Sequence, residues 1–278
     1  MKRRTFIGTL GAAATALAVP RRAFASTRLD RIGLELYSVR SAMRADPERT
    51  LAAVRAIGYT DVELLWSFRN FGRTPEQVRA TLDREGLRAP SAHMAPEAML
   101  TGWEYSLDTA KLLGHDYLIV PSLPAETKTS LDAWRVWADR FNTAGAAARR
   151  QGIWLAFHNE PDHMKEIDGK VPYDLFVERL DPSAVRLQLD VGNMIMGGGD
   201  PMRYLARYTD RYWSFHLKDV VSDRTRDTEL GTGVLDIAQF LAAVPDVARK
   251  PCYVEQEGPK DELASAGHNF QYVKTLDF

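Results

Sequence analysis

The chain has 278 residues, with 36 basic and 37 acidic side chains and a formal net charge of −1. This balance argues against a protein that binds the phosphate backbone of nucleic acids. The single cysteine, Cys252, excludes a disulfide framework and a cysteine-rich zinc site.

Residues 1–25 have the pattern of an export signal. A charged start containing Arg3-Arg4 precedes a small apolar run over 9–19, and Ala23-Phe24-Ala25 offers a cleavage point. The run is too short and too weakly apolar for a stable membrane anchor. Because the paired arginines resemble the twin-arginine type, we expect the twin-arginine machinery to export the folded protein to the periplasm. Cleavage would remove five basic residues, lower the net charge to −6 and leave residues 26–278 as one domain.

From residue 32 onward, short apolar runs typical of buried parallel strands alternate with amphipathic segments typical of helices. The predicted order is strand 32–37, helix 46–57, strand 61–65, helix 74–86, strand 89–93, helix 102–113, strand 117–120, helix 131–150, strand 153–158, helix 173–180, strand 185–190, a short helix after 200–201, strand 212–218, helix 236–244, strand 252–257 and helix 261–275. This alternation predicts a single (β/α)8 barrel, or TIM barrel. An open doubly wound sheet is the alternative, which the lack of a glycine-rich dinucleotide fingerprint after the first strand disfavours.

Many of these strands end in ionisable residues, and three pairs repeat at period two: His158 with Glu160, His216 with Lys218, and Glu255 with Glu257. Residues two apart on a strand share a face, and in a barrel the carboxyl ends of the strands converge on one pocket. The candidate site residues are Glu35, Glu63, His93, His158, Glu160, Asp190, His216, Lys218, Glu255 and Glu257.

A mixture of imidazoles and carboxylates suits a divalent metal, with Mn²⁺ as the first expectation and Mg²⁺, Co²⁺ or Zn²⁺ as alternatives. We predict the ligands Asp190, His216 and Glu255, with His158 or Glu160 as the fourth.

We also predict where the other tryptophan and histidine side chains lie: at the barrel rim, in the core or at the surface. Trp66, just after the second strand, either stacks on a sugar ring or packs in its loop, whereas Trp134 and Trp137 share a helix face that we expect in the core. We expect the remaining histidines at the surface: His115, His163 and His268.

Six short motifs together resemble the xylose isomerase-like barrel superfamily, in the group labelled sugar phosphate isomerases/epimerases. They are Gly58-Tyr59-Thr60-Asp61-Val62-Glu63, Ser91-Ala92-His93, Phe157-His158-Asn159-Glu160, Leu189-Asp190-Val191-Gly192-Asn193, Phe215-His216-Leu217-Lys218-Asp219 and Val254-Glu255-Gln256-Glu257. The resemblance implies a metal held by an acidic residue on strand five, an Asp on strand six, a His on strand seven and a Glu on strand eight. The last three match Asp190, His216 and Glu255.

The chain departs from the family pattern on strand five. Epimerases of the family place a glutamate there as ligand and base, whereas the matching position here is His158, with Glu160 two residues on. The resemblance implies an isomerase or epimerase that removes a proton next to a carbonyl and stabilises an enediolate with the metal. The departure leaves a lyase acting on a 3-keto sugar, a glycoside or an inosose as the alternative.

For this chemistry the base would be Glu257, Glu160 or His93, and Lys218 would donate to the developing oxyanion or would instead form a salt bridge. The expected substrate contacts are Glu35, Glu63, Trp66 and Asn159, although the first two could instead pair with an arginine such as Arg40.

Two other classes of protein compete with this hypothesis. An apurinic endonuclease of the Endonuclease IV type needs more histidines and a basic face, which the acidic mature chain lacks. A non-catalytic sugar-binding barrel would have lost the metal ligands, which are present here. We expect an unphosphorylated sugar or polyol as substrate and no nucleic acid as partner; the sequence leaves self-association open.

Overall fold

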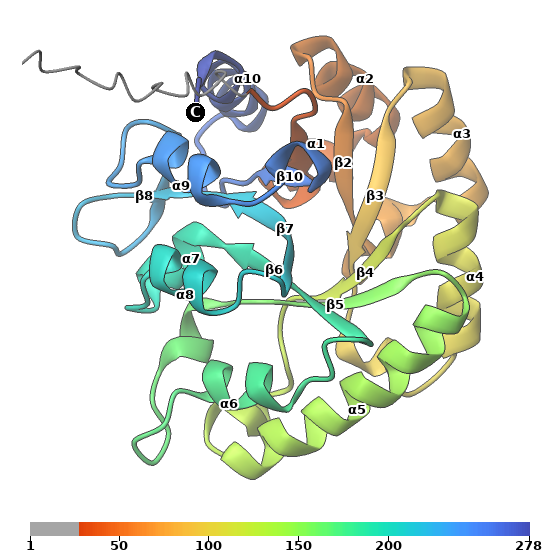
Figure 1. Cartoon of the computed structure of the whole chain (residues 1–278). Coiled ribbons are helices and arrows are strands. Elements are labelled where there is room, and N and C mark those ends of the chain that lie inside the picture. Colours follow the sequence, from red (N-terminus) through yellow and green to blue (C-terminus); the bar gives the residue numbers. More distant parts are fainter. Residues whose placement is uncertain (1–27) are drawn as a thin grey trace, which may run out of the picture.

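A computed structural model describes residues 28–278 as a closed barrel of parallel strands surrounded by helices (Figure 1). Around the barrel the strands follow the order β1-β10-β7-β6-β5-β4-β3-β2. Their bounds are β1 Gly33–Glu35, β2 Asp61–Leu65, β3 Arg88–His93, β4 Tyr117–Val120, β5 Trp154–His158, β6 Val185–Asp190, β7 Tyr212–Leu217 and β10 Cys252–Val254. The predicted (β/α)8 barrel is therefore confirmed, while the predicted signal at 1–25 lies outside the described residues.

The helices follow the strands and pack on the outside of the barrel (Figure 1). They are α1 Arg40–Ala45, α2 Pro47–Ile57, α3 Pro75–Glu85, α4 Trp103–Leu113, α5 Leu131–Arg150, α6 Pro172–Arg179, α7 Val191–Met196, α8 Pro201–Arg207, α9 Ile237–Ala243 and α10 Glu262–Thr275. Short 3-10 turns join them: η1 Leu36–Val39, η2 Trp66–Gly72, η3 Pro96–Met99, η4 Ala125–Lys128, η5 Pro161–Met164 and η6 Val247–Arg249.

The starts of the long helices follow from their capping residues. The Asp46 side chain accepts a hydrogen bond from the Arg49 N–H at the start of α2, and Thr74 forms a capping box with Gln77 at the start of α3. Each cap satisfies backbone donors that have no partner inside the helix. Because such capped helices alternate with apolar strands, the sequence alone predicts the barrel.

Several boundaries and short elements differ from the prediction. The chain leaves the first strand after Glu35 and the last after Val254, earlier than the predicted ends at 37 and 257. The sequence also gave no sign of α1, α7 or the antiparallel pair β8 Asp219–Val220 with β9 Asp227–Thr228. These elements have two to six residues, which is too short for a periodic pattern to form.

The main core lies between the strands and the surrounding helices. Trp134 and Trp137 on α5 are buried there, as predicted. The surface placement of His115 and His163 is wrong, because both are at least 95 % buried; His268 is exposed as expected. The two buried rings pack against aromatic neighbours, His115 beside Trp66 and His163 stacked on Phe157.

The interior of the barrel has an apolar lower part, which includes Ile119 and Ala156. At the amino-terminal ends of the strands, the Arg186 guanidinium lies between the Trp154 and Trp213 rings, 3.6 and 3.5 Å from their centroids. This stack closes one end of the barrel with cation–π contacts. The opposite, carboxyl-terminal end is where polar side chains enter the interior.

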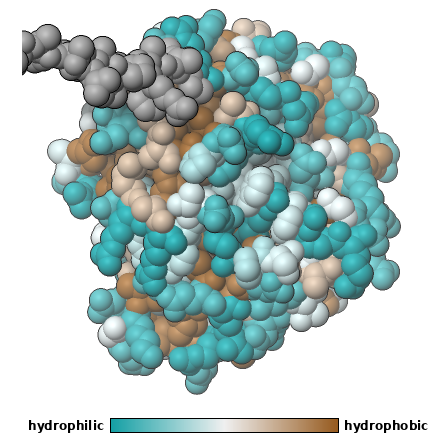
Figure 2. Space-filling model, viewed as in Figure 1, coloured by the Kyte–Doolittle hydropathy of each residue, from teal (hydrophilic) through white to brown (hydrophobic). Residues whose placement is uncertain are grey.

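Hydrophilic residues cover most of the face seen in Figure 2, and its hydrophobic groups are small and separated. No helix within residues 28–278 is both long and apolar enough to cross a membrane.

Candidate active site

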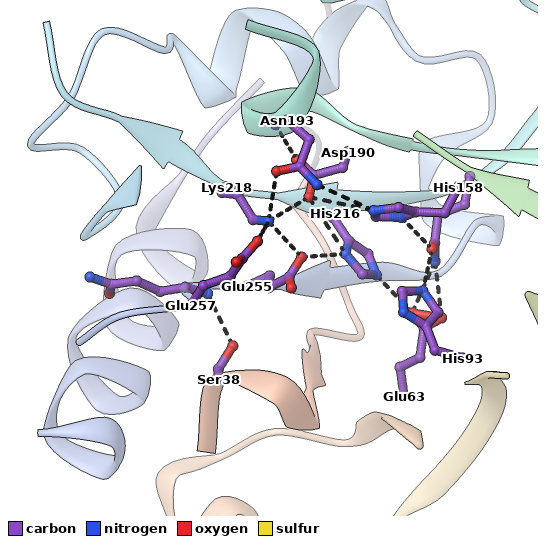
Figure 3. Close-up of polar contacts among 12 residues, drawn as sticks. Ser38, Glu63, His93, His158, Asp190, Asn193, His216, Lys218, Glu255 and Glu257 are labelled. Carbon is purple, nitrogen blue, oxygen red and sulfur yellow. Dashed lines mark hydrogen bonds and ion pairs between the residues drawn. The ribbon is translucent and has the colours of Figure 1, made fainter. Parts of the chain in front are cut away.

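Side chains from three neighbouring strand ends converge at the carboxyl-terminal end of the barrel (Figure 3). Asp190 ends β6, His216 lies near the end of β7, and Glu255 directly follows β10; their donor atoms all lie within 4.8 Å of one another. His216 Nδ1 is 2.6 Å from Glu255 Oε2 and 3.8 Å from Asp190 Oδ2. The structure therefore brings together the three predicted metal ligands.

These residues fit a divalent metal. Asp190 Oδ2 is buried and takes part in no well-directed hydrogen bond, although Lys218 Nζ lies 2.9 Å away. It faces ring nitrogens of His216 and His158 at 3.8 and 3.9 Å. A buried carboxylate oxygen beside two imidazoles is a donor set that Mn²⁺, Co²⁺ and Zn²⁺ all accept.

Lys218 is completely buried and supplies the positive charge in the middle of the site. Its Nζ lies 2.6 Å from Glu257, 2.9 Å from Asp190 and 3.1 Å from Glu255, and it donates a hydrogen bond to Asn193 Oδ1 at 3.0 Å. Burial opposes the charge, but the three carboxylates hold the pKa of Lys218 well above its usual value.

The predicted salt bridge of Lys218 is formed with these carboxylates and not with Asp219. The Asp219 carboxylate instead accepts hydrogen bonds from the backbone N–H groups of Val220, Gly231, Gly233 and Leu235. It therefore orders the rim segment that follows β7.

Sequence reasoning missed three residues of the site. Gly192 leaves room for the lysine, because a Cβ there would lie 2.6 Å from Lys218 Cγ. Asn193 links Lys218 to Glu160, whose Oε2 accepts from the amide at 3.1 Å. Gln188 precedes Asp190 by two positions on β6, so the period-two rule that selected the other pairs could have found it. Gly192 and Asn193 lie on α7, which the sequence did not predict.

A second layer of polar contacts lies around Glu63, which is completely buried in the middle of β2. Glu63 accepts hydrogen bonds from His216 Nε2 at 2.8 Å, from the Gln188 amide at 2.9 and 3.0 Å, and from the Ser91 hydroxyl at 3.1 Å. Gln188 Oε1 in turn lies 2.9 Å from nitrogens of both His93 and His158. In Figure 3, His216 lies between this layer and the group around Lys218.

Glu35 is the least satisfied of the predicted residues. It is completely buried, and neither carboxylate oxygen has a hydrogen-bond partner. Burial and the Glu63 charge raise its pKa well above the usual value, against weaker effects of His216 and the Tyr37 backbone. Arg40 pairs with neither glutamate: it donates to the Tyr37 carbonyl and lies over the Tyr37 ring.

Asn159 and Trp66, which were both expected to contact the substrate, contact other parts of the protein. Asn159 is completely buried, and its amide makes two 2.9 Å hydrogen bonds with the backbone of Asp190, so it ties the ends of β5 and β6 together. Trp66 is half-buried with its ring 5.6 Å from that of His115, and its Nε1 has no hydrogen-bond partner. Loop packing is thus the observed role of Trp66.

The charges of His216 and Glu255 stabilise each other. Burial opposes the imidazolium of His216, but Glu255 and Glu63 hold its pKa well above the usual value. Burial likewise opposes ionisation of Glu255, but Lys218 and His216 hold its pKa well below the usual range. Glu255 is therefore an anion between two cations.

The groups on the strand-five side are neutral at pH 7. Burial, with His216 and His93 nearby, lowers the pKa of His158 well below its usual value. Burial also raises the pKa of Glu160 to about 8, although 30 % of its side chain is exposed. The site thus has a neutral imidazole and a protonated acid on one side, and Glu257 beside Lys218 on the other.

Residues 51–276 match the family model described as the xylose isomerase-like TIM barrel. The chain belongs to this family. The resemblance read from the strand-end motifs is therefore confirmed at the level of the family.

An inosose dehydratase from Geobacillus kaustophilus is 28 % identical over 202 residues, which are 63 % of each chain. The chain thus spans less than two thirds of that relative's length. A sugar phosphate isomerase/epimerase from Parabacteroides distasonis superposes with a TM-score of 0.75 at 24 % identity, covering 88 % of this chain and 94 % of that one. The IOLI protein with a bound zinc atom superposes with a TM-score of 0.70 at 14 % identity, covering 89 % and 99 %. Both structures share the fold.

Proposed function

We propose that the protein is a divalent-metal-dependent lyase that eliminates water or an alcohol from a keto sugar, a keto-glycoside or an inosose. The observation that carries this proposal is the asymmetry of the site. The strand-five position that would hold a second carboxylate base in an epimerase holds the neutral, buried His158. Of the described carboxylates that contact Lys218, Glu257 is the one that is not a proposed metal ligand. The similarity to an inosose dehydratase supports the same reaction class.

Asp190, His216 and Glu255 would hold the metal, which when bound would polarise the substrate carbonyl and stabilise negative charge on its oxygen. Glu257, whose side chain is 43 % exposed, would take the proton from the carbon next to the carbonyl. The C–H electron pair forms a C=C bond between this α carbon and the carbonyl carbon, and the carbonyl oxygen becomes an enolate oxygen. When the carbonyl re-forms, that electron pair makes a C=C bond between the α carbon and the adjacent β carbon. The C–O bond at the β carbon breaks, and its electron pair leaves with the oxygen.

The leaving oxygen needs a proton, and Glu160 carries one at neutral pH because its pKa is raised to about 8. Transfer of that proton completes the loss of one molecule of water or alcohol. Asn193 would hold Glu160 and Lys218 in place, since it donates to the first and accepts from the second.

An isomerase or epimerase is the second candidate, and Glu160 is the observation that favours it. A second carboxyl group on the strand-five side could return a proton to the opposite face of the substrate. The same residues would then act without breaking a C–O bond.

Product analysis in D₂O separates the two reactions. Full-length protein loaded with Mn²⁺, Co²⁺ or Zn²⁺, beside a chelated sample, would be incubated with an inosose, a 3-keto-glucoside and free ketoses. We expect a product lighter by one water or alcohol in mass spectrometry, formed only with metal. A product of unchanged composition that carries deuterium would support the isomerase instead.

Two variants sharpen this experiment. Glu257→Gln should abolish turnover while keeping bound metal. Glu229→Gln, at a half-exposed glutamate outside the site, should leave turnover unchanged. Metal binding without reaction or proton exchange on any of these substrates would sink the lyase proposal and favour a sugar-binding barrel.

We also propose that the substrate is unphosphorylated and that the protein acts after export. Among the described residues, the hydrogen bonds and ion pairs of the site side chains include no arginine that could bind a phosphate group. Amino-terminal sequencing of protein from the periplasmic fraction tests the export signal, with a mature start near residue 26 as the expected result.

A further inference from the structure

We propose that Glu63 and Gln188 form a hydrogen-bonded relay that sets the tautomers of His158 and His216, which makes His158, and not Glu160, the strand-five metal ligand. The inference rests on the metal-dependent function proposed above. It assigns two positioning residues and the fourth ligand of the same centre.

The Glu63 carboxylate fixes the orientation of the Gln188 amide. An ionised carboxylate only accepts hydrogen bonds, so the amide nitrogen must face it. Gln188 Nε2 lies 2.9 and 3.0 Å from the two Glu63 oxygens. The amide oxygen of Gln188 therefore points the other way, toward the imidazoles.

That oxygen fixes the tautomer of two histidines. It lies 2.9 Å from His158 Nδ1 and 2.9 Å from His93 Nε2. Because an amide oxygen has two lone pairs and no hydrogen, both nitrogens must donate to it. With its hydrogen on Nδ1, the neutral His158 ring has its lone pair on Nε2.

The lone pair of His158 is directed into the metal site. His158 Nε2 lies 3.9 Å from Asp190 Oδ2, which is an acceptor without a well-directed hydrogen bond. Asn193 Nδ2 lies 3.4 Å from His158 Nε2. Two buried acceptors that face each other at this distance suit a cation between them, in addition to the Lys218 ammonium that lies 2.9 Å from Asp190.

Glu63 also acts directly on His216. It accepts from His216 Nε2 at 2.8 Å, so the Nε2 hydrogen stays in place. Nδ1 faces Asp190 and Glu255; it donates to Glu255 in the metal-free imidazolium and is the nitrogen that would lose its hydrogen when a metal binds. A carboxylate behind a histidine is the usual way to fix the ring of a metal ligand and raise its basicity. The buried Glu63 carboxylate thus orients two imidazoles: that of His216 directly, and that of His158 through Gln188.

The resulting ligand set has two nitrogens and two carboxylate oxygens, from His158, Asp190, His216 and Glu255. They come from β5, β6, β7 and the end of β10, three adjoining strand pairs of the barrel. Asp190 Oδ2 is 3.8 and 3.9 Å from the two nitrogens. Ligands about 2.0–2.2 Å from one ion lie roughly 3–4 Å apart, so the Asp190 oxygen lies at a suitable distance from each ring. The compact group of Asp190, His216 and Glu255 does not include His158, so His158 would have to approach His216 and Glu255 when the ion binds. Glu160 remains free to carry a proton.

The same hydrogen bonds argue against a metal at one of the two other buried groups, which consists of Glu35, Glu63, His93 and His216. The His216 and His93 nitrogens nearest Glu63 carry hydrogens, since one donates to Glu63 and the other to Gln188. They have no lone pair to offer a cation on that side.

Nitrogen-15 NMR of the full-length protein tests the relay. Two-bond ¹H–¹⁵N correlations of ¹⁵N-histidine-labelled protein distinguish the two tautomers. We expect His158 in the Nδ1–H form in both the metal-free and the zinc-loaded protein. Zinc should shift the resonances of His158 Nε2 and His216 Nδ1.

Three variants separate the relay from simple packing. Gln188→Met removes both hydrogen-bonding functions, and we expect loss of the Nδ1–H form of His158 and a zinc dissociation constant raised about 10–100-fold. Gln188→Glu, as a protonated acid, keeps an oxygen for the imidazoles and one O–H donor for Glu63, so it should restore the tautomer and most of the affinity. Gln256→Met is the matched control, because this buried amide bonds only Ser265 and Asn269 through its side chain.

Several results would overturn the relay. An Nε2–H tautomer of His158 in the parent chain would do so without any variant, even if Gln188→Met failed to fold. Zinc that shifts His216 but not His158, or a Gln188→Met protein with unchanged tautomer and affinity, would also overturn it and leave the proposed lyase intact. Conversely, intact tautomers and zinc binding without elimination would sink only the proposed function.

Discussion

Lys218 balances the charge of the carboxylates at the mouth of the barrel. Its ammonium group contacts Asp190, Glu255 and Glu257, and the side chain is completely buried. Two of these carboxylates are also the proposed metal ligands, so lysine and metal share the same anions. The lysine therefore stabilises the metal-free site and limits its affinity for a cation.

Replacing Lys218 by methionine tests this balance. The variant leaves buried carboxylates without their cation, so we expect the free energy of unfolding of metal-free protein to fall by about 3–5 kcal/mol. Zinc should recover more stability in the variant than in the parent chain. Urea denaturation with and without zinc measures both effects. Lys128→Met is the control, since this mostly exposed lysine pairs only with Asp162 at 3.1 Å; a loss below about 1 kcal/mol is expected there. An equally small loss in Lys218→Met would contradict the prediction.

The absence of a side chain at Gly192 is a second requirement of the site. A Cβ at this position would lie 2.6 and 2.8 Å from Lys218 Cγ and Cβ and 2.8 Å from its carbonyl oxygen. We expect Gly192→Ala to displace the lysine and to cost about 1–3 kcal/mol of unfolding free energy. Chemical denaturation and the affinity for zinc would be measured together.

Gly267→Ala is the control for Gly192→Ala, because it adds the same methyl group where there is room for it. Gly267 lies within α10, and a Cβ there would meet no atom within 4 Å. Alanine is the better helix former by about 0.5–1 kcal/mol, so this variant should gain stability. Equal effects of the two alanines would mean that the close approach to Lys218 does not matter.

Among the elements, the rim segment after β7 is organised by a single carboxylate. Asp219 Oδ2 accepts from the backbone N–H groups of Gly231 and Gly233, and Oδ1 accepts from that of Leu235 at 3.0 Å. The same segment includes β9, where Asp227 accepts from the backbone N–H of Glu257. The position of the proposed base therefore depends on an element held by Asp219.

Asp219→Ala should loosen this segment. We expect the amides of Gly231, Gly233 and Leu235 to exchange with solvent at least about tenfold faster, because they lose a buried acceptor. Hydrogen–deuterium exchange with peptide resolution measures the change. Asp236→Ala removes a helix cap in the same region, where Asp236 accepts from the Gln239 N–H at 2.9 Å, and should affect only the start of α9. Unchanged protection over 231–235 would contradict the assigned role.

At the scale of the whole molecule, buried histidines make stability depend on pH. Burial lowers the pKa of His115 to about 4, from 6.5 in the unfolded chain. Between these values the unfolded state binds more protons than the folded state, so stability falls as the pH falls from 6.5 to 4. A shift of this size corresponds to about 3 kcal/mol for one group.

His115→Asn removes this titration but keeps a side-chain N–H that can donate to the Ala89 carbonyl, the acceptor of the His115 ring. We expect the variant to lose about 2–3 kcal/mol less stability than the parent between pH 6.5 and 4. Urea denaturation over that range gives the comparison. His268→Asn, at an exposed position on α10, should follow the parent curve. Parallel curves for all three proteins would show that the His115 ring is not protected from protonation.

The sequence by itself determined the barrel and picked out Asp190, His216 and Glu255 as residues that meet at one end of it. Apolar strand runs, capped helices and the period-two pairs at the strand ends are local patterns, and a closed parallel barrel places such ends together. Gln188 obeyed the same pattern and could have been found, since it lies two residues before Asp190.

Only the tertiary structure decided which partner each polar group takes. Lys218 bonds carboxylates of two other strand ends while its neighbour Asp219 binds the rim, and Asn159 binds backbone where substrate was expected. The burial of His115 and His163 was equally hidden. Hydrogen bonds in a buried site join residues far apart in the chain, such as Glu63 and His216, which are 153 positions apart, and their geometry depends on closure of the barrel. Local sequence patterns carry no information on such distances, because they reflect only the burial of one face of each element.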